Sequence, residues 1–218
     1  MTALLSTTYF GPVQWYQKLC RAESVLIERW ENFQKQTYRN RCVIATANGT
    51  QALTVPIERG GSQLIKDIRI SDHGNWRHLH WNALVSAYGE SPFFEYYQDD
   101  IRPFFEKRWT FLYDFNEEIR QTMCELIDIE PSVGHSEQYI AEAADGLDGL
   151  NNDDTHEQTG SPLHDYREAI NPKHPLPDPD FTPQRYYQVY GQRHGFLPNL
   201  SVLDLLFNMG PESVMILK

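Results

Sequence analysis

The chain has 218 residues, 13% of them aromatic, and a formal net charge of −11. This length favours one domain over residues 1–218, and the negative charge without a basic stripe argues against nucleic acid as the main partner. No apolar run approaches the ~20 residues that span a bilayer, and the amino-terminal residues lack the pattern of a secretion signal, so we expect a cytoplasmic protein.

The first expected elements are a strand at residues 4–9, which Gly11-Pro12 breaks, and a helix at residues 15–22. Residues 25–38 fit either a bending strand or a short helix. The dipeptide Asn48-Gly49 then lies between two β-rich runs, which is the strongest local signal for a hairpin. As a two-residue loop it would pair Ile44 with Leu53 and form a hairpin at residues 41–57.

Polar residues lie at the open end of this hairpin. Because side chains alternate along a strand, Asn40 and Tyr38 continue the core-facing row, whereas Arg41 points the other way. A buried amide without a partner costs ~1–3 kcal/mol, so Asn40 either ties down a neighbouring loop or contacts a ligand. The cluster of Lys35, Arg39 and Arg41 is either an anion site of ligand size or a solvated strand end.

Apolar spacing predicts the remaining elements. These are a strand at 64–70, helices at 76–88, 92–105 (kinked or ended by Pro103) and 115–129 (capped by Asn116), a strand at 185–189, a helix at 200–209 (capped by Asn199 or Ser201), and a last strand at 214–217. Together with the hairpin they predict an α+β fold, with a mixed β-sheet packed against several helices.

Residues 131–183 differ in composition from the rest of the chain. They are rich in Asp, Glu, Gly, Asn and Pro, and their apolar residues are too few to order the stretch. We expect a partly mobile acidic loop or insertion within the domain. Such a segment could bind a protein partner by becoming ordered on contact.

Three histidines lie close together in the sequence, at His73, His78 and His80. We expect no metal site, because residues two apart on a helix face different directions. His80 lies on one helix stripe with Trp76 and Tyr88. An imidazole against aromatic rings has a lowered pKa and can accept a proton in catalysis. The alternative is a core histidine that bonds a backbone carbonyl.

The other reactive residue types give weaker signals. Asp204, three residues after Ser201, resembles the acidic member of a capping box, so helix capping is its expected role. The widely spaced Cys20, Cys42 and Cys124 are typical of reduced thiols. No glycine-rich nucleotide motif or hydrolase elbow is present, and the sequence assigns no cofactor.

Several segments resemble the WbqC-like protein family. They are Tyr9-Phe10-Gly11-Pro12, KQTYRNR, LTVPI, Trp76 with His80, AYGESPFF and the terminal FLPNLSVLDLLFNMGPES. The resemblance covers about two-thirds of the chain, and the acidic stretch departs from it. The family takes its name from a gene of O-antigen clusters. The resemblance therefore implies surface-polysaccharide biosynthesis, with transfer of an acyl or aminoacyl group to an amino sugar or nucleotide-linked amino sugar.

A mechanism consistent with this resemblance uses six residues. Tyr38, Asn40 and Arg41 would hold the anionic or carbonyl part of a small-molecule or sugar-nucleotide substrate. Trp76 and Tyr88 would stack on a ring, and His80 would take a proton from the acceptor amine.

Two alternatives remain open. One is a non-catalytic module that binds a glycan or an assembly partner. The other is cysteine-dependent acyl or amide transfer, which requires Cys20 or Cys42 beside a histidine.

Overall fold

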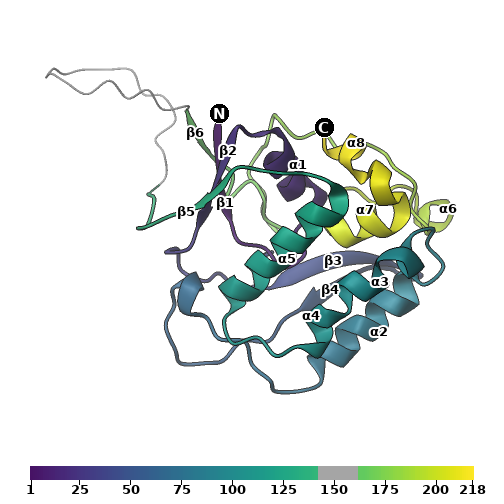
Figure 1. The fold of residues 1–218 in the computed structure, drawn as a ribbon, viewed down its shortest axis with the longest axis horizontal. Helices are drawn as coiled ribbons and strands as arrows, with labels where there is room; N and C mark the ends of the chain where they lie inside the picture. The colour runs from purple at the N-terminus through teal and green to yellow at the C-terminus, as the bar shows by residue number, and fades with distance from the viewer. Residues whose placement is uncertain (142–161) are drawn as a thin grey trace, which may run out of the picture.

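The computed structural model describes residues 1–141 and 162–218. Its largest sheet is parallel throughout, with the strand order β5–β2–β1–β6 (Figure 1). The strands are β1 (Thr2–Ser6), β2 (Ser24–Glu28), β5 (Val133–His135) and β6 (Leu163–Asp165). A separate antiparallel hairpin, β3 (Arg41–Thr46) and β4 (Gly49–Thr54), completes the α+β fold expected from the sequence.

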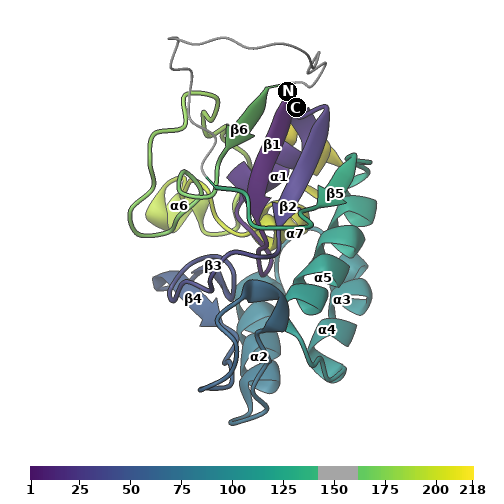
Figure 2. The same cartoon turned by 90° about the vertical axis from the view of Figure 1, so that its left-hand side faces the viewer.

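The first half of the parallel sheet is a βαβ unit. β1 runs into α1 (Val13–Arg21), which returns the chain to β2 beside β1 in parallel register. Pro12 precedes the helix in an extended conformation, as its fixed φ and missing N–H favour. α1 also packs against α7 (Val202–Met209) and α8 (Ser213–Leu217), so both termini lie at one end of the molecule (Figures 1 and 2).

The two outer strands come from the acidic stretch, which corrects the expectation of a loop throughout residues 131–183. β5 pairs with β2, and β6 pairs with β1 on the opposite edge (Figure 2). Each has three residues, and its stability comes from pairing with a buried neighbour, which composition does not reveal. Residues 142–161 of this stretch lie outside the described residues, so the expected partial mobility of residues 131–183 stays a prediction.

The hairpin forms as expected, but its register differs by two residues. Thr46 pairs with Gly49, and Ile44 faces Gln51 in place of Leu53. A type I′ turn over Asn48-Gly49 needs positive φ at both residues, and only Gly49 of the two has it, at +111°. The turn therefore centres on Ala47 and Asn48. A two-residue shift keeps every side chain on its predicted face, so the core-facing row is preserved.

Helices cover the hairpin and the rest of the core. α2 (Trp76–Tyr88) and α7 both pack against β3. The other helices of the described residues are α3 (Phe94–Ile101), α4 (Pro103–Glu106), α5 (Leu112–Ile127), α6 (Gly191–His194), and two short 3₁₀ segments at Ile65–Asp67 and Gly210–Glu212. Pro103 ends one helix and begins the next, as the sequence predicts.

Three predicted strands and one cap were wrong. Residues 64–70 form a 3₁₀ turn flanked by isolated bridges, residues 185–189 have no regular structure, and residues 214–217 belong to α8. Asn116 lies inside α5, where its amide donates to the Arg39 carbonyl at 2.8 Å. In each case a tertiary contact overrides the local preference.

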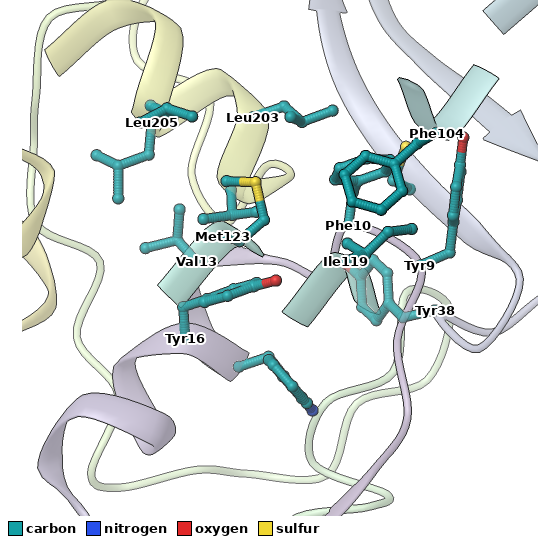
Figure 3. Packing of buried hydrophobic residues seen from close by; sticks show 14 of the residues in the cluster. Tyr9, Phe10, Val13, Tyr16, Tyr38, Phe104, Ile119, Met123, Leu203 and Leu205 are labelled. Carbon is teal, nitrogen blue, oxygen red and sulfur yellow. The ribbon is translucent and has the colours of Figure 1, made fainter. Parts of the chain in front are cut away.

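The core lies where α1, α5 and α7 meet. Figure 3 shows Val13 and Tyr16 of α1 beside Met123 of α5, with Leu203 and Leu205 of α7 across from them. A second group lies under the hairpin and contains Tyr9, Phe10 and Phe104. Phe10 contacts Phe104 edge to face, with ring centroids 5.8 Å apart. This aromatic group forms the support behind the hairpin.

Candidate functional site

A cleft of about 790 Å³ opens at the base of the hairpin. Its size lies within the range of small-molecule sites. Four segments form its walls: residues 33–36, the start of β3, the end of β4 and the loop at 56–63. Phe33, Val55, Ile57 and Ile68 supply the apolar part of the lining, and the polar part comes from Asn40 and the basic residues nearby.

Asn40 carries a buried hydrogen-bond acceptor without a partner at the base of the cleft. Its side chain is 94% buried, with 6% exposed, and its amide Nδ2 donates to the Val55 carbonyl at 2.8 Å. Its Oδ1 has no partner within the described residues. Swapping the amide would place oxygen against the Val55 carbonyl oxygen, so the orientation is fixed. A buried unpaired carbonyl costs ~1–3 kcal/mol, and this one has no surface open to the cleft.

Three cations line the same cleft: Lys35, Arg41 and Arg59. None of them forms an ion pair among the residues that the structure describes. Arg41 Nε donates to the Thr54 hydroxyl at 3.1 Å. The one carboxylate in the lining, Glu58, pairs with Arg69 outside it at 3.3 Å. In a chain with a net charge of −11, this leaves a local positive field suited to an anion.

A second cleft, of about 380 Å³ beside α2, provides a contrast. It also contains three arginines, but each has a carboxylate partner. Arg77 and Arg108 contact Asp72 at 2.7 and 3.4 Å, and Arg102 contacts Glu106 at 2.6 Å. Its positive charge is therefore neutralised within the protein.

Of the six residues predicted for the site, Asn40 and Arg41 line the hairpin cleft together. The alternation of a strand predicted that they would point apart. The structure corrects this, because β3 begins only at Arg41, and Asn40 precedes the regular strand. Lys35 also lines the cleft as the basic cluster suggested, whereas Arg39 turns inward to Glu31.

Tyr38 and Trp76 are buried away from the cleft. Tyr38 borders a cavity of about 10 Å³, room for about one water molecule, and burial raises its pKa to about 12. Trp76 donates its indole N–H to the Ser71 carbonyl at 3.1 Å. Neither ring presents a face to the cleft on which a substrate could stack.

Tyr88 belongs to a buried network centred on Asp204. The Asp204 carboxylate accepts from Tyr88 at 2.8 Å, Tyr186 at 2.7 Å and Gln188 at 2.9 Å. Burial raises the pKa of Asp204, while these three bonds act in the opposite direction. Ser201 does cap α7, accepting from Leu203 N, but the capping role expected for Asp204 is wrong. Asp204 instead joins α2, α7 and residues 186–188.

His80 lies directly behind the cleft. Its Nδ1 is 2.9 Å from the Tyr9 hydroxyl, and its ring packs edge to face on Trp76. Burial lowers its pKa to about 4, with a hydrogen bond to the backbone of Thr54 acting the other way. Thr54 lines the cleft and holds Arg41. Its burial and its bond to Tyr9 favour the alternative of a core histidine over a base that faces the cleft.

The sequence analysis missed a charged cluster at the carboxyl ends of the parallel strands. Arg39 forms two hydrogen bonds with Glu31, at 2.8 and 2.5 Å, and one with Ser6 at the end of β1. Arg167 forms a similar pair with Asp165 at the end of β6. Ligands of parallel sheets bind at this edge. Charged residues at or just after the strand ends were therefore the sequence signal that could have revealed this cluster.

Cysteine and metal chemistry find no support in the described residues. Burial raises the pKa of Cys42 to about 12 and also raises that of Cys20, which disfavours the reactive thiolate. His78 bonds Asn82 at 2.9 Å, apart from His80. Over residues 1–141 and 162–218, no three His, Cys, Asp or Glu side chains gather closely enough to hold a metal ion.

Comparisons with known proteins support the resemblance. The WbqC-like protein family matches residues 7–216. An uncharacterized protein of Mycobacterium tuberculosis, Rv1507c, is 28% identical over 224 residues, covering 97% of this chain and 94% of that protein. No solved structure matches the chain significantly. Among the described residues, no helix is both long and apolar enough to cross a membrane.

Proposed function

Because the chain belongs to the WbqC-like protein family, we propose that it is a transferase of surface-polysaccharide biosynthesis that modifies a nucleotide-linked amino sugar. The observation that carries the proposal is the hairpin cleft. Three cations without acidic partners among the described residues line a space large enough for such a substrate. A nucleotide-linked sugar carries phosphate groups, and their negative charge would match the cations.

The reaction we propose is acyl or aminoacyl transfer. The sugar amine attacks the activated carbonyl of a thioester or ester donor, forming an amide C–N bond as the C–S or C–O bond breaks. The leaving thiolate or alkoxide takes one proton, and the amine loses one to water at the exposed rim. Arg41 and Lys35 hold the anionic substrate while this occurs.

We propose that His80 supports this cleft and does not take the proton. A base must reach the amine within about 3 Å or through one water. His80 is instead held between Tyr9 and the backbone of Thr54, behind the wall that carries Arg41. Its contribution would be to keep that wall in place.

The test is conversion of a nucleotide-linked amino sugar by the purified protein. The substrate is incubated with acyl and aminoacyl thioesters, and mass spectrometry follows loss of the free amine and gain of the acyl mass. Arg41→Gln should reduce conversion by about tenfold or more. Arg108→Gln, an exposed arginine outside the cleft, is the matched control and should leave conversion unchanged.

The same assay addresses the alternative of a non-catalytic binding module. A protein that binds the sugar nucleotide but converts none, across both donor classes, would be such a module. Inactivation of a converting enzyme by thiol alkylation would instead support cysteine-dependent transfer.

A further inference from the structure

We infer that the protein has a second binding site, separate from the hairpin cleft, which takes the ring of an amino sugar in its protonated form. The site is a pocket at the carboxyl edge of the parallel sheet, which we call the sheet pocket. The inference goes beyond the proposed function, because it concerns another pocket and does not depend on acyl transfer. It places the ammonium group of the sugar beside Glu168.

The sheet pocket lies where the strand order of the parallel sheet reverses. β2 lies on one side of β1 and β6 on the other, and the strands run in parallel toward the hairpin (Figure 2). Ligands of open parallel sheets bind outside the carboxyl ends of the strands at such a point. The segments that follow β2, β5 and β6 line the pocket and contribute Trp30, Tyr139 and Glu168.

The size and the aromatic walls of the pocket suit one sugar ring. Its volume is about 280 Å³, just below the ~300–1,000 Å³ of sites for drug-sized ligands. Tyr139 packs on Arg167 at 5.5 Å and keeps 55% of its surface exposed, so the ring can cover the apolar face of a sugar. Trp30 is half-buried at the same pocket, with Lys66 over its ring at 4.5 Å. The Lys66 charge is paired with Asp67 at 3.1 Å.

Two exposed amides supply hydrogen bonds for sugar hydroxyls. Asn32 and Gln34 both line the pocket and are exposed. Each carboxamide offers a donor and an acceptor, which a hydroxyl can use in either direction. These accessible groups, and not the buried ion pairs at the inner wall, are the ones that a ligand can reach.

The charge of the pocket selects a cation. Glu31 in the lining is paired with Arg39 at 2.8 Å, and Asp165 with Arg167 at 2.9 Å. Glu168 accepts from Gln34 Nε2 at 3.4 Å and forms no ion pair among the described residues. One negative charge is therefore left over, and a primary ammonium can pair with it. The three cations of the hairpin cleft would repel the same group.

The two sites lie on opposite sides of one wall. Asn32 and Gln34 face the sheet pocket, whereas Phe33 and Lys35 of the same segment line the hairpin cleft. The wall is held by the bond from Phe33 N to the Gln63 carbonyl at 2.7 Å. Because the two linings share no residue, each site can be altered without the other.

The experiment is a ligand-observed NMR titration at about pH 6.5 with four probes. They are glucosamine, glucose, N-acetylglucosamine and cyclohexylamine. Glucosamine should bind at least fivefold more tightly than glucose or N-acetylglucosamine, which lack the charge. Cyclohexylamine carries the ammonium without the hydroxyls, so it should also bind at least fivefold more weakly than glucosamine.

Protein variants test the assignment of Glu168. Glu168→Gln keeps the shape of the side chain and removes its charge, so it should weaken glucosamine about fivefold to tenfold and leave glucose unchanged. Glu118→Gln, at an exposed glutamate of α5 outside the pocket, is the matched control and should weaken neither. Thermal melting confirms that each variant is folded at the titration temperature.

Two further comparisons test the aromatic wall and the separation of the sites. Tyr139→Leu should weaken glucosamine and glucose by similar factors, whereas Tyr96→Leu, at a side chain 75% exposed elsewhere, should weaken neither. Arg41→Gln should leave the affinity for glucosamine unchanged, and Glu168→Gln should leave the affinity for pyrophosphate unchanged.

The contradicting outcomes are distinct. Equal binding of glucosamine and the two neutral sugars would overturn the role of the ammonium. Equal binding of glucosamine and cyclohexylamine would overturn the assignment of a sugar. Loss of glucosamine binding in Arg41→Gln, but not in Glu168→Gln, would move the sugar to the hairpin cleft and overturn the second site. Failure of acyl transfer would refute the proposed transferase and leave this inference standing.

Discussion

Arginines lie both in the hairpin cleft and at the carboxyl edge of the parallel sheet, but they differ in whether a carboxylate pairs with them. At the sheet edge, Arg39 pairs with Glu31 and Arg167 with Asp165. In the hairpin cleft, Arg41 and its basic neighbours have no acidic partners in the described residues. The two regions meet in the sequence at Arg39-Asn40-Arg41. Arg39 pairs with Glu31 at the sheet edge, whereas Arg41 lines the hairpin cleft.

The difference teaches how the protein uses charge. The two charges of a buried ion pair neutralise each other and hold chain segments together, so they attract a ligand only weakly. An unpaired cation at a rim contributes little to folding but retains its attraction for an anion. The paired region should therefore control stability, and the unpaired region should control binding.

The largest expected effect comes from breaking the buried pair. Arg39→Met leaves the Glu31 carboxylate buried without its cation, which should lower the free energy of unfolding by about 3–5 kcal/mol. Arg41→Gln should change it by no more than about 0.5 kcal/mol. Urea denaturation at pH 7 measures both.

A double variant is the control for this prediction. Arg39→Met combined with Glu31→Leu removes both charges, so it should recover most of the lost stability. Equal losses from Arg39→Met and Arg41→Gln would show that the two regions do not differ as proposed.

The second prediction concerns His80, which supports the cleft wall. Its pKa is about 4 in the folded protein, below the ordinary value of 6.5, so the unfolded chain binds the proton more readily. Stability should therefore fall as the pH drops from about 6.5 to 4, by about 3 kcal/mol at most. The variant His80→Gln should lack this part of the pH dependence in urea denaturation at several pH values.

Turnover by the same variant tests the role of the imidazole. If His80 took the proton from the amine, His80→Gln would lower the rate by ~10²-fold with unchanged nucleotide affinity. A supporting role predicts that the turnover rate and the substrate affinity change together.

The stability measurement has its own contradicting outcome. Identical pH profiles for the stability of the native protein and of His80→Gln would show that burial does not hold the histidine neutral.

The third prediction extends the comparison to Asp204, a buried carboxyl group that is held by neutral hydrogen-bond donors. Tyr186→Phe removes the 2.7 Å bond to Asp204, which should cost about 2 kcal/mol of unfolding free energy. Tyr187→Phe, at a side chain 56% exposed, is the matched control and should cost less than about 0.5 kcal/mol. Equal effects would mean that Asp204 is satisfied without Tyr186.

Local patterns predicted the parts of the site that local geometry determines. The apolar alternation of the hairpin places Asn40 at the end of a buried row, and the structure keeps it there, even though the turn differs by two residues. The stripe of α2 likewise places His80 inside. Such features depend on residues close in the sequence.

The rest depends on distant partners that no local pattern encodes. Arg39 and Arg41 look alike in the sequence, and only the position of Glu31 decides which one turns inward. Arg59 enters the site from a loop without periodicity. β5 and β6 have too few residues to carry a pattern and form only because β2 and β1 lie beside them.

The smallest expected effect lies at the hairpin tip, and it tests whether stability and binding are separable. Gly49 has φ of +111°, and a Cβ there would contact nothing within 4 Å, so Gly49→Ala adds backbone strain alone, about 1 kcal/mol. Gly61→Ala has the same free space without positive φ and should cost less than about 0.5 kcal/mol. Gly49 lies five residues before Thr54 of the cleft, roughly 17 Å along the strand. Gly49→Ala should therefore leave the affinity for pyrophosphate unchanged in calorimetry. A weaker affinity in that variant would mean that the cleft depends on the whole hairpin, and binding would then follow stability in both regions.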